Sequence, residues 1–399
     1  MKLDLTFFLL FVGSISYGQI VTIPDANFKN ALVNEFTIDF DGDGAADGDA
    51  DTNNDGEIQQ SEAEAALGLI VIGRFVDSFV GIESFVNLVS VNINNNNATE
   101  LDLSSNINLT SIRSINNDLV SLILPNSSTL ESLECAVNEL VTIDFSQSIN
   151  LNFIDIDGNN LTELDVTNNT DLIYLDCDFN EISELDVSQN IILEILDVEA
   201  NNLSFLDVSN NPNLRILDGT FNELNNVILE NDNLITVNLD YNLLTTVDLS
   251  QCPGVREFRC TNNPNLANLD ISNGTITDFD HVIVDDNPNL FCIQVDDVAY
   301  ANSQGWKKDT WASYSKFCTL GIENNLSLIN ISLTPNPVQE FLTIISDFQI
   351  DEIRVYSLNG GLVYDSHESI INLSHLKSGI YFSLIIIDGK GIIKKFVKE

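Results

Sequence analysis

The stretch LIYLDCDFNEISELDVSQNIIL, residues 172–193, decides the fold of this chain. Its apolar residues alternate with polar ones in two triplets, residues 175–177 and 185–187, and Asn180 stands between them. Alternation with period 2 predicts two short strands, each with two inward side chains and one outward side chain between them. The next stretch repeats the arrangement around Asn201, so the unit is one of a series.

The asparagine recurs with a regular period through the middle of the chain. Six steps of 21 residues, then one of 20 and one of 21, join Asn96, Asn117, Asn138, Asn159, Asn180, Asn201, Asn222, Asn242 and Asn263. A lone coil cannot bury its apolar side, whereas stacked coils form one continuous core. Each asparagine amide can bond the backbone of adjacent turns, which predicts a structural ladder. We expect a second, weaker ladder at Asn106, Ser127, Ser148, Asn169, Asn190 and Asn211.

The whole pattern, L-x-x-L-x-L-x-x-N-x-L-x-x-L-x-V, resembles a short form of the leucine-rich repeat. The resemblance implies a mainly β solenoid of about nine repeats over residues 81–290, with strands about 4.8 Å apart. The stretch LFCIQVDDVAYANSQGWKKDTWASYSKFC, residues 290–318, resembles the terminal cap of secreted bacterial leucine-rich repeat proteins. That resemblance implies a C-terminal cap at residues 291–318, and a Cys292–Cys318 disulfide would suit a secreted chain.

Four further cysteines lie within the repeats. Cys135, Cys177 and Cys260 take the inward position that Ile156 fills in another repeat, so we expect them to be small core residues. Cys252 falls in the second ladder, and the sequence assigns it no partner.

Residues 19–80 are expected to form an N-terminal cap with a helix and an acidic loop. Asp25 is placed to cap a helix in the stretch IPDANFKNALVN, residues 23–34. The stretch DTNNDGEIQQSE, residues 51–62, resembles an EF-hand calcium loop, with Gly56 at the sharp turn. The resemblance implies calcium ligands at Asp51, Asn53, Asp55, Glu57, Gln59 and Glu62. An acidic turn without metal is the alternative, and a bound calcium ion would stabilise the cap rather than act as a sensor.

A second acidic run, DFDGDGAADGD at residues 39–49, lies immediately upstream. Its opening order matches a calcium loop, but Ala50 stands where the twelfth-position ligand is needed. The position of Asp47 makes the run resemble the Asp-rich calcium loops of thrombospondin type 3 repeats. A second, weaker calcium ion is therefore a hypothesis, with ligands Asp39, Asp41, Asp43 and Asp47.

The two ends of the chain predict an exported protein. Residues 1–18 have the apolar core of a cleavable signal peptide, and a membrane helix is the alternative. After a linker at residues 319–330, residues 331–399 alternate β-rich runs with turns, which predicts a small antiparallel β-sandwich. No later segment is long and apolar enough to predict a membrane span.

The tail also resembles the type A C-terminal sorting domain of the bacterial type IX secretion system. The motifs are Pro335-Asn336-Pro337, Asn359-Gly360, Gly379-Ile380-Tyr381 and Lys394-Lys395-Phe396-Val397-Lys398. The resemblance implies transit through the periplasm, binding to the secretion machinery and removal of the tail, so the mature protein would be secreted or lie on the outer cell surface. An ordinary β-sandwich binding module is the alternative.

The composition excludes several function classes. The formal net charge is -44, with 16 Lys and Arg against 60 Asp and Glu, which disfavours nucleic acid and anionic lipid as partners. The chain has three histidines, and zinc spacings and phosphate-binding glycine loops are absent from the sequence. We therefore do not expect an enzyme.

Acidic residues form outward columns on the predicted strands. On the first strands the column members are Asp155, Asp157, Asp176, Asp178, Asp197, Glu199 and Asp218, and on the second strands Asp144, Asp165, Asp186 and Asp207. Unscreened like charges about 5 Å apart cost roughly 0.8 kcal/mol per pair even in water. Screening by salt is one account of this cost. The other is that the first-strand face, with Phe153, Tyr174 and Phe179, binds a cationic protein surface or divalent ions.

The function expected from the sequence is non-enzymatic binding of an extracellular protein, or adhesion. The alternative is an accessory role in the capture or breakdown of extracellular polysaccharide.

Overall fold

The computed structural model describes residues 18–318, 331–346, 348–357, 362–387 and 390–399. Residues 1–17 of the expected signal peptide, the linker at 319–330 and the Asn359-Gly360 motif lie outside this set. The described chain divides after residue 318 into two compact units. No helix within the described ranges is both long and apolar enough to cross a membrane.

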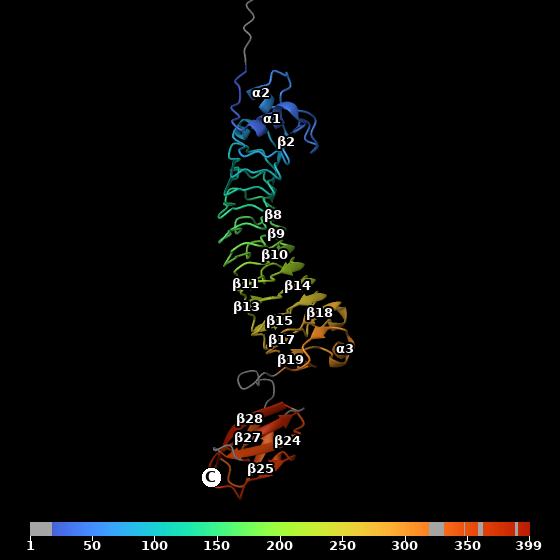
Figure 1. Cartoon of the computed structure of the whole chain (residues 1–399). Helices are drawn as coiled ribbons and strands as arrows, with labels where there is room; N and C mark the ends of the chain where they lie inside the picture. Colours follow the sequence, from blue (N-terminus) through green and yellow to red (C-terminus); the bar gives the residue numbers. More distant parts are fainter. Residues whose placement is uncertain (1–17, 319–330, 347, 358–361, 388–389) are drawn as a thin grey trace, which may run out of the picture. The chain divides into compact units, whose positions relative to one another are not determined.

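The first unit is a solenoid whose coils are joined through a 13-stranded sheet. Figure 1 shows these coils stacked in chain order from the blue to the orange part of the chain. The sheet opens with β1 (Ile38–Asp39) antiparallel to β2 (Gly68–Ile70), and every later pair is parallel. The later strands are β3 (Ser90–Asn92), β5 (Ser111–Arg113), β7 (Ser132–Glu134), β8 (Phe153–Asp155), β9 (Tyr174–Asp176), β10 (Ile195–Asp197), β12 (Ile216–Asp218), β14 (Thr236–Asn238), β16 (Glu257–Arg259), β18 (His281–Val284) and β20 (Lys307–Lys308).

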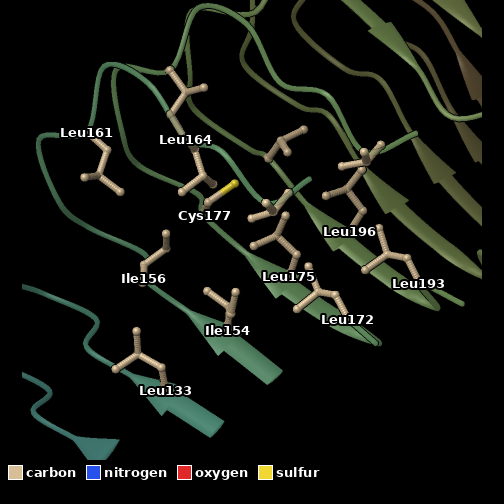
Figure 2. Close-up of a cluster of buried hydrophobic side chains, with 14 of the residues drawn as sticks. Leu133, Ile154, Ile156, Leu161, Leu164, Leu172, Leu175, Cys177, Leu193 and Leu196 are labelled. Atoms are coloured by element: carbon tan, nitrogen blue, oxygen red, sulfur yellow. The ribbon is translucent and has the colours of Figure 1, made fainter. Parts of the chain in front are cut away.

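The core is a continuous stack of inward side chains. In β9 the middle residue Leu175 is fully buried, whereas Tyr174 and Asp176 on either side are only half-buried. Figure 2 shows such residues from successive coils stacked in the interior, with Cys177 among them. One hydrophobic cluster runs from Val21 to Tyr314. The thiols of Cys135, Cys177, Cys252 and Cys260 are free and buried in this core.

The second triplets form strands in only part of the solenoid. β4 (Glu100–Asp102) pairs with β6 (Ser121–Ile123), and β11 (Phe205–Asp207) with β13 (Asn226–Ile228). A four-stranded sheet follows, made of β15 (Thr246–Asp248), β17 (Asn268–Asp270), β19 (Cys292–Gln294) and β21 (Ser313–Ser315). Residues 143–145, 164–166 and 185–187 are fully described but form no strand and no backbone hydrogen bond between coils. The expectation of two strands in every repeat is wrong for these coils.

Repulsion between acids accompanies the missing second strands but does not by itself prevent pairing. In two of the paired coils acids face neutral residues, with Asp102 opposite Ile123 and Asp207 opposite Ile228, whereas Asp248 lies opposite Asp270 in the paired strands β15 and β17. In the unpaired coils, the repeat places acids at equivalent positions of neighbouring coils. The residues that follow the inward position are Asp144, Asp165 and Asp186, and two of the residues that precede it are Glu163 and Glu184. Like charges directly opposite one another destabilise strand pairing.

Two asparagine ladders join the coils on either side of these triplets. The Asn180 amide nitrogen donates to the carbonyls of Cys177 and Ile156, both at 3.1 Å, and its oxygen accepts the N–H of Leu161 at 3.0 Å. One side chain therefore bridges two coils, and all nine ladder asparagines make contacts of this kind. In the second ladder, the amide of Asn190 donates to the carbonyl of Asn169 at 2.8 Å.

The N-terminal cap covers the first coil with two short helices. Helix α1 (Ala26–Asn34) begins at Asp25, whose carboxylate accepts the N–H groups of Asn27 and Phe28 at 2.9 Å. Phe28 is fully buried and packs edge-on against Phe79. Helix α2 (Gln60–Ala63) and the 3₁₀ turn η1 (Ile82–Ser84) complete the cap.

The C-terminal cap contains the predicted disulfide, Cys292–Cys318, which is confirmed. Helix α3 (Val298–Ser303) and the 3₁₀ turn η2 (Ile276–Asp278) belong to this end of the solenoid. Trp306 packs edge-on against three aromatic rings, those of Phe279, Tyr300 and Tyr314. This aromatic cluster covers the last coils and excludes water from the end of the core.

The second unit consists of two antiparallel sheets, as expected for the tail. One has the order β22 (Ser332–Thr334), β23 (Phe341–Ile345), β26 (Ile370–Asn372), and the other β25 (Leu362–Ser366), β24 (Glu352–Ser357), β27 (Gly379–Ile387), β28 (Lys390–Lys398). Buried residues from both sheets, such as Leu342 and Ile385, form a single cluster. The sheets therefore pack face to face.

Replacing Asn180 with Ala should destabilise the solenoid by about 1–3 kcal/mol, because the buried N–H of Leu161 loses its acceptor, whereas the carbonyl of Ile156 keeps its bond from Asn159. The measurement is urea unfolding followed by circular dichroism. Asn210→Ala, at an exposed turn residue, is the control and should change stability by less than about 0.5 kcal/mol. Equal effects of the two variants would contradict the ladder role.

Candidate functional site

Seven acidic residues lie together on the outward face of β8, β9, β10 and β12. Asp155, Asp176, Asp197 and Asp218 are in register on adjacent strands. Asp157, Asp178 and Glu199 follow two residues later on three of the same coils. We name these seven residues the acidic face. All are half-buried, and no Lys or Arg of the described chain lies within 4.0 Å of their carboxylates.

Burial and mutual repulsion raise the pKa values of five carboxylates on the acidic face, those of Asp155, Asp176, Asp178, Asp197 and Glu199. Burial, together with the charges of Asp157 and Asp176, raises the pKa of Asp155 to about 7. The same two causes raise the pKa of Asp178 to about 8, and burial raises that of Asp197 to about 7. Within the described structure, the buried Oδ1 atoms of Asp155 and Asp178 accept no hydrogen bond. The face therefore favours uptake of protons or cations near neutral pH.

Aromatic residues border the acidic face. Phe153 and Tyr174 stack with ring centroids 4.4 Å apart, and the Tyr174 hydroxyl donates to Asp176 at 3.0 Å. On the other border, Phe179 directly precedes the ladder residue Asn180, and its side chain is 58% exposed. The structure thus brings the predicted acids and the three predicted aromatic residues onto one face.

Phe179 belongs to a wider column of residues with positive φ that the repeat pattern did not predict. The residues directly before the ladder asparagines have positive φ in Asn95, Asn116, Val137, Gly158, Phe179, Ala200, Phe221, Tyr241 and Asn262. Glycine and asparagine adopt this region readily, whereas a bulky residue there costs of order 1–3 kcal/mol. Phe221 and Tyr241 nevertheless occupy it, with stacked and exposed rings 4.3 Å apart. Exposed aromatic rings held at strained positions are typical of binding surfaces.

The loop at residues 51–62 has the backbone of a calcium loop. The buried Asp51 carboxylate accepts the N–H of Asp55 at 3.0 Å and of Gly56 at 2.7 Å. Gly56 has φ 82°, as the sharp turn requires. Glu62, in α2, accepts the N–H groups of Asn53 and Gln59 at 3.2 and 2.9 Å.

Side chains of this loop bond to one another. Gln59 donates to both carboxylate oxygens of Asp55 at 3.0 and 3.1 Å, and Asn53 donates to Gln59 at 2.6 Å. The Glu57 side chain pairs with Lys29 at 2.6 Å. The group of Glu57 that could bind a metal ion at this loop position is therefore its backbone carbonyl oxygen. The oxygen donors fit calcium, a hard cation that binds carboxylate, amide and carbonyl oxygens.

The upstream run brings its carboxylates closer together than the 51–62 loop does. Oxygen atoms of Asp39, Asp41 and Asp43 lie within 4.8 Å of one another, and among the described residues no such group of three acids arises from the 51–62 loop. Asp39 accepts the N–H groups of Gly42 and Gly44 at 2.6 and 2.8 Å. Asp47 is not in this group, and its carboxylate accepts the N–H of Phe40 at 2.8 Å. Two further groups lie on the acidic face, at Asp176, Asp178, Asp197 and at Asp197, Glu199, Asp218.

Raised pKa values on the acidic face predict that stability falls as pH rises. The ordinary pKa of aspartate is 3.8, whereas in the folded chain the pKa is about 7 for Asp155 and about 8 for Asp178. Between pH about 4 and about 8 the folded chain therefore binds more protons than the unfolded chain. This stability is full below pH 4 and is lost as pH rises through the folded values. Since these side chains are partly solvent-exposed, we expect about 1 kcal/mol, or ~2–4 °C in Tm, between pH 5 and pH 8.5.

Scanning calorimetry of the parent and of Asp155→Asn/Asp178→Asn would measure this slope, and the double variant should flatten it. The control is Asp165→Asn/Asp186→Asn, because hydrogen bonds from Thr167 and Ser188 lower the pKa of these exposed aspartates. A slope that persists in the first variant would contradict the assignment.

Comparison with known proteins identifies the tail. Residues 332–399 match the family model described as the secretion system C-terminal sorting domain. The match confirms the expected sorting domain and indicates an exported protein, secreted or held at the cell surface. No curated protein sequence matched the chain.

Solved leucine-rich repeat structures resemble the chain at low identity. The functional domain of InlJ from Listeria monocytogenes is 20% identical, with 96% of this chain and 98% of that chain covered and a TM-score of 0.44. A leucine-rich repeat protein of Leptospira interrogans is 16% identical over 64% and 80% of the two chains, with a TM-score of 0.43. An internalin from Listeria monocytogenes, InlF, is 18% identical over 75% and 96%, with a TM-score of 0.38. This chain is a mainly β solenoid of stacked repeats followed by a secretion system C-terminal sorting domain.

Proposed function

We propose that the protein is a non-enzymatic, extracellular binding protein whose acidic face holds a cationic surface of a partner protein. The observation that carries this proposal is the acidic face itself, with seven half-buried carboxylates, no described cation beside them and aromatic rings along its borders. Export to the cell surface or beyond supports an extracellular partner.

Binding of Lys or Arg side chains would relieve the repulsion within the face. A cation that approaches Asp155 or Asp178 lowers their pKa values, so binding would release protons near neutral pH. The ring faces of Phe153 and Tyr174 lie in reach of the same cations and add a cation–π contribution of about 0.5–1 kcal/mol at an exposed site. Such an interface would weaken with added salt.

Capture of extracellular polysaccharide is the second candidate function. The stacked pair Phe221–Tyr241, whose rings are exposed, favours it, because exposed ring faces can pack against the apolar faces of sugar rings, and the half-buried pair Phe153–Tyr174 offers less ring surface. Aspartates beside the rings can accept hydrogen bonds from sugar hydroxyl groups.

For the N-terminal cap we propose a structural calcium ion in the 51–62 loop. The ligands would be Asp51, Asn53, Asp55, the Glu57 carbonyl, Gln59 and Glu62, and the ion would tie α2 to the preceding loop. A second, weaker ion would be held by Asp39, Asp41 and Asp43, with Asp47 beside them. The ion would supply stability to the cap and no chemistry.

For export we propose a signal peptide at residues 1–18, transit through the periplasm and passage through the type IX secretion machinery. The match of residues 332–399 to the sorting-domain family supports this route.

Neutralising the centre of the acidic face should weaken partner binding. Asp155→Asn/Asp176→Asn/Asp197→Asn removes three charges at almost constant shape, and we expect at least about tenfold weaker binding, or ~1.4 kcal/mol. The control, Asp102→Asn/Asp207→Asn/Asp248→Asn, changes the net charge equally on the second strands. The parent and both variants would be prepared as the fragment 19–318, which lies within one compact unit. Their binding would be measured on arrays of extracellular proteins and on arrays of glycans. Protein ligands that respond to the first variant support the proposal, glycan ligands support the second candidate, and ligands that respond equally to both variants contradict both.

Calcium should stabilise the cap. At a hundredfold excess of calcium over Kd, binding to the folded chain alone adds about 2.7 kcal/mol, so EDTA should lower the melting temperature and expose the cap to protease. Glu62→Gln should remove this response, whereas Asp43→Asn should keep most of it. Titration calorimetry with calcium chloride would count the sites, and an unchanged melting temperature in EDTA would refute the calcium site.

A further inference from the structure

A cleft of about 770 Å³ opens on the second side of the solenoid, over the coils where the second strands are missing. Ile143, Leu164 and Leu185 stand at the same place in three successive repeats and form its apolar floor. Phe205, from the next coil, completes the apolar lining and is 46% exposed. An aliphatic and aromatic surface is therefore accessible between the coils.

The two ladders join the successive coils on either side of this cleft. At one margin the Asn180 oxygen accepts the N–H of Leu161 at 3.0 Å, and at the other the Asn190 amide donates to the carbonyl of Asn169 at 2.8 Å. The N–H of Glu181 donates to the carbonyl of Leu161 at 2.8 Å. From there to the second ladder, the backbones of these two described coils make no hydrogen bond to each other. Free N–H and C=O groups thus lie beside the apolar floor.

Exposed acids line both margins of the cleft. Glu163 and Glu184 precede the floor residues, and Asp165 and Asp186 follow them. Thr167 donates its hydroxyl to Asp165 at 2.6 Å and its N–H at 3.0 Å. No Lys or Arg of the described chain lies within 4.0 Å of these four carboxylates. The hydrogen bonds stabilise the ionised form of the aspartates, so the margins remain negative at neutral pH.

We propose that this cleft is a second binding site, which takes a cationic segment of a partner protein whose Lys or Arg residues flank aliphatic side chains. Charge complementarity selects the occupant, because the fixed negative margins surround an apolar floor. The aliphatic side chains cover the half-buried floor residues Ile143 and Leu185, and the cations pair with the four acids. The site goes beyond the proposed function, because it lies on the opposite side of the coils and uses none of the residues of the acidic face.

A labelled peptide, Lys-Leu-Lys-Leu-Lys-Leu-Lys, tests the site by fluorescence anisotropy against the 19–318 fragment. Glu163→Gln/Asp165→Asn/Glu184→Gln/Asp186→Asn should weaken binding about tenfold or more. The matched control, Glu223→Gln/Glu230→Gln/Asp232→Asn/Asp248→Asn, changes the net charge equally at exposed positions outside the cleft and should weaken binding less than about twofold. Melting temperatures of both variants check that the fold is kept.

Two further arms separate the cleft from general charge attraction. A peptide with Ser in place of Leu, and the exposed-site variant Phe205→Ala, should each weaken binding, because the apolar floor and wall contribute. Equal losses in the cleft variant and the control variant would overturn the proposal. So would a loss that occurs only when the acidic face is neutralised by Asp155→Asn/Asp176→Asn/Asp197→Asn, which would place the peptide on that face.

Discussion

The buried hydrogen bond between a ladder asparagine and the neighbouring coil is the interaction on which the rest of the structure depends. Each amide satisfies backbone groups of two coils, as Asn180 does for Leu161 and Ile156. An unsatisfied buried N–H is costly, so each repeat must place its asparagine in step with the previous one. This fixes the period near 21 residues, and the fixed period aligns every outward position into a column. The acidic columns are therefore a direct result of the ladder.

The two sides of each coil respond differently to the repulsion within their columns. On the first side the strands stay paired, as at Asp176 and Asp197, and the carboxylates are half-buried with raised pKa values. On the second side, side-chain and backbone groups of Thr167 and Ser188 stabilise the charge of Asp165 and Asp186, and the coils do not pair. The central coils thus present two surfaces, a closed one that favours protons or cations and an open one with an apolar floor.

The fold was predictable because its signals recur in every coil. Inward residues such as Leu175 and Leu196, and ladder residues such as Asn180, repeat at one spacing, so a local ambiguity in one repeat is resolved by the next. The candidate sites were predictable only in part. The acidic face followed from alternation, but the cleft depends on the balance between pairing and repulsion across coils, which residues 164–166 alone do not reveal. The positive φ of Phe221 is likewise imposed by the ladder against the preference of phenylalanine.

Charge is distributed along the solenoid in a way that leaves the acidic face without a Lys or Arg of the described chain within 4.0 Å, although Arg215 and Glu194 pair at 3.7 Å on the same coils. Arg113 pairs with Glu134 on the coils before the acidic face, and Arg259 pairs with Asp240 on the coils after it. A coil in the middle of a solenoid has a stabilising neighbour on each side, whereas a terminal coil has only one. Repulsion is therefore tolerated best in the middle, where the acidic face and the cleft lie, whereas bulky residues with positive φ also occur nearer the ends, at Phe75 and Tyr241. The caps, with the Cys292–Cys318 disulfide at one end and the acidic loops at the other, keep the ends of this array closed. The half-buried carboxylates and the open apolar floor would destabilise an isolated coil. They lie in the middle of the stack, where neighbouring coils on both sides stabilise them.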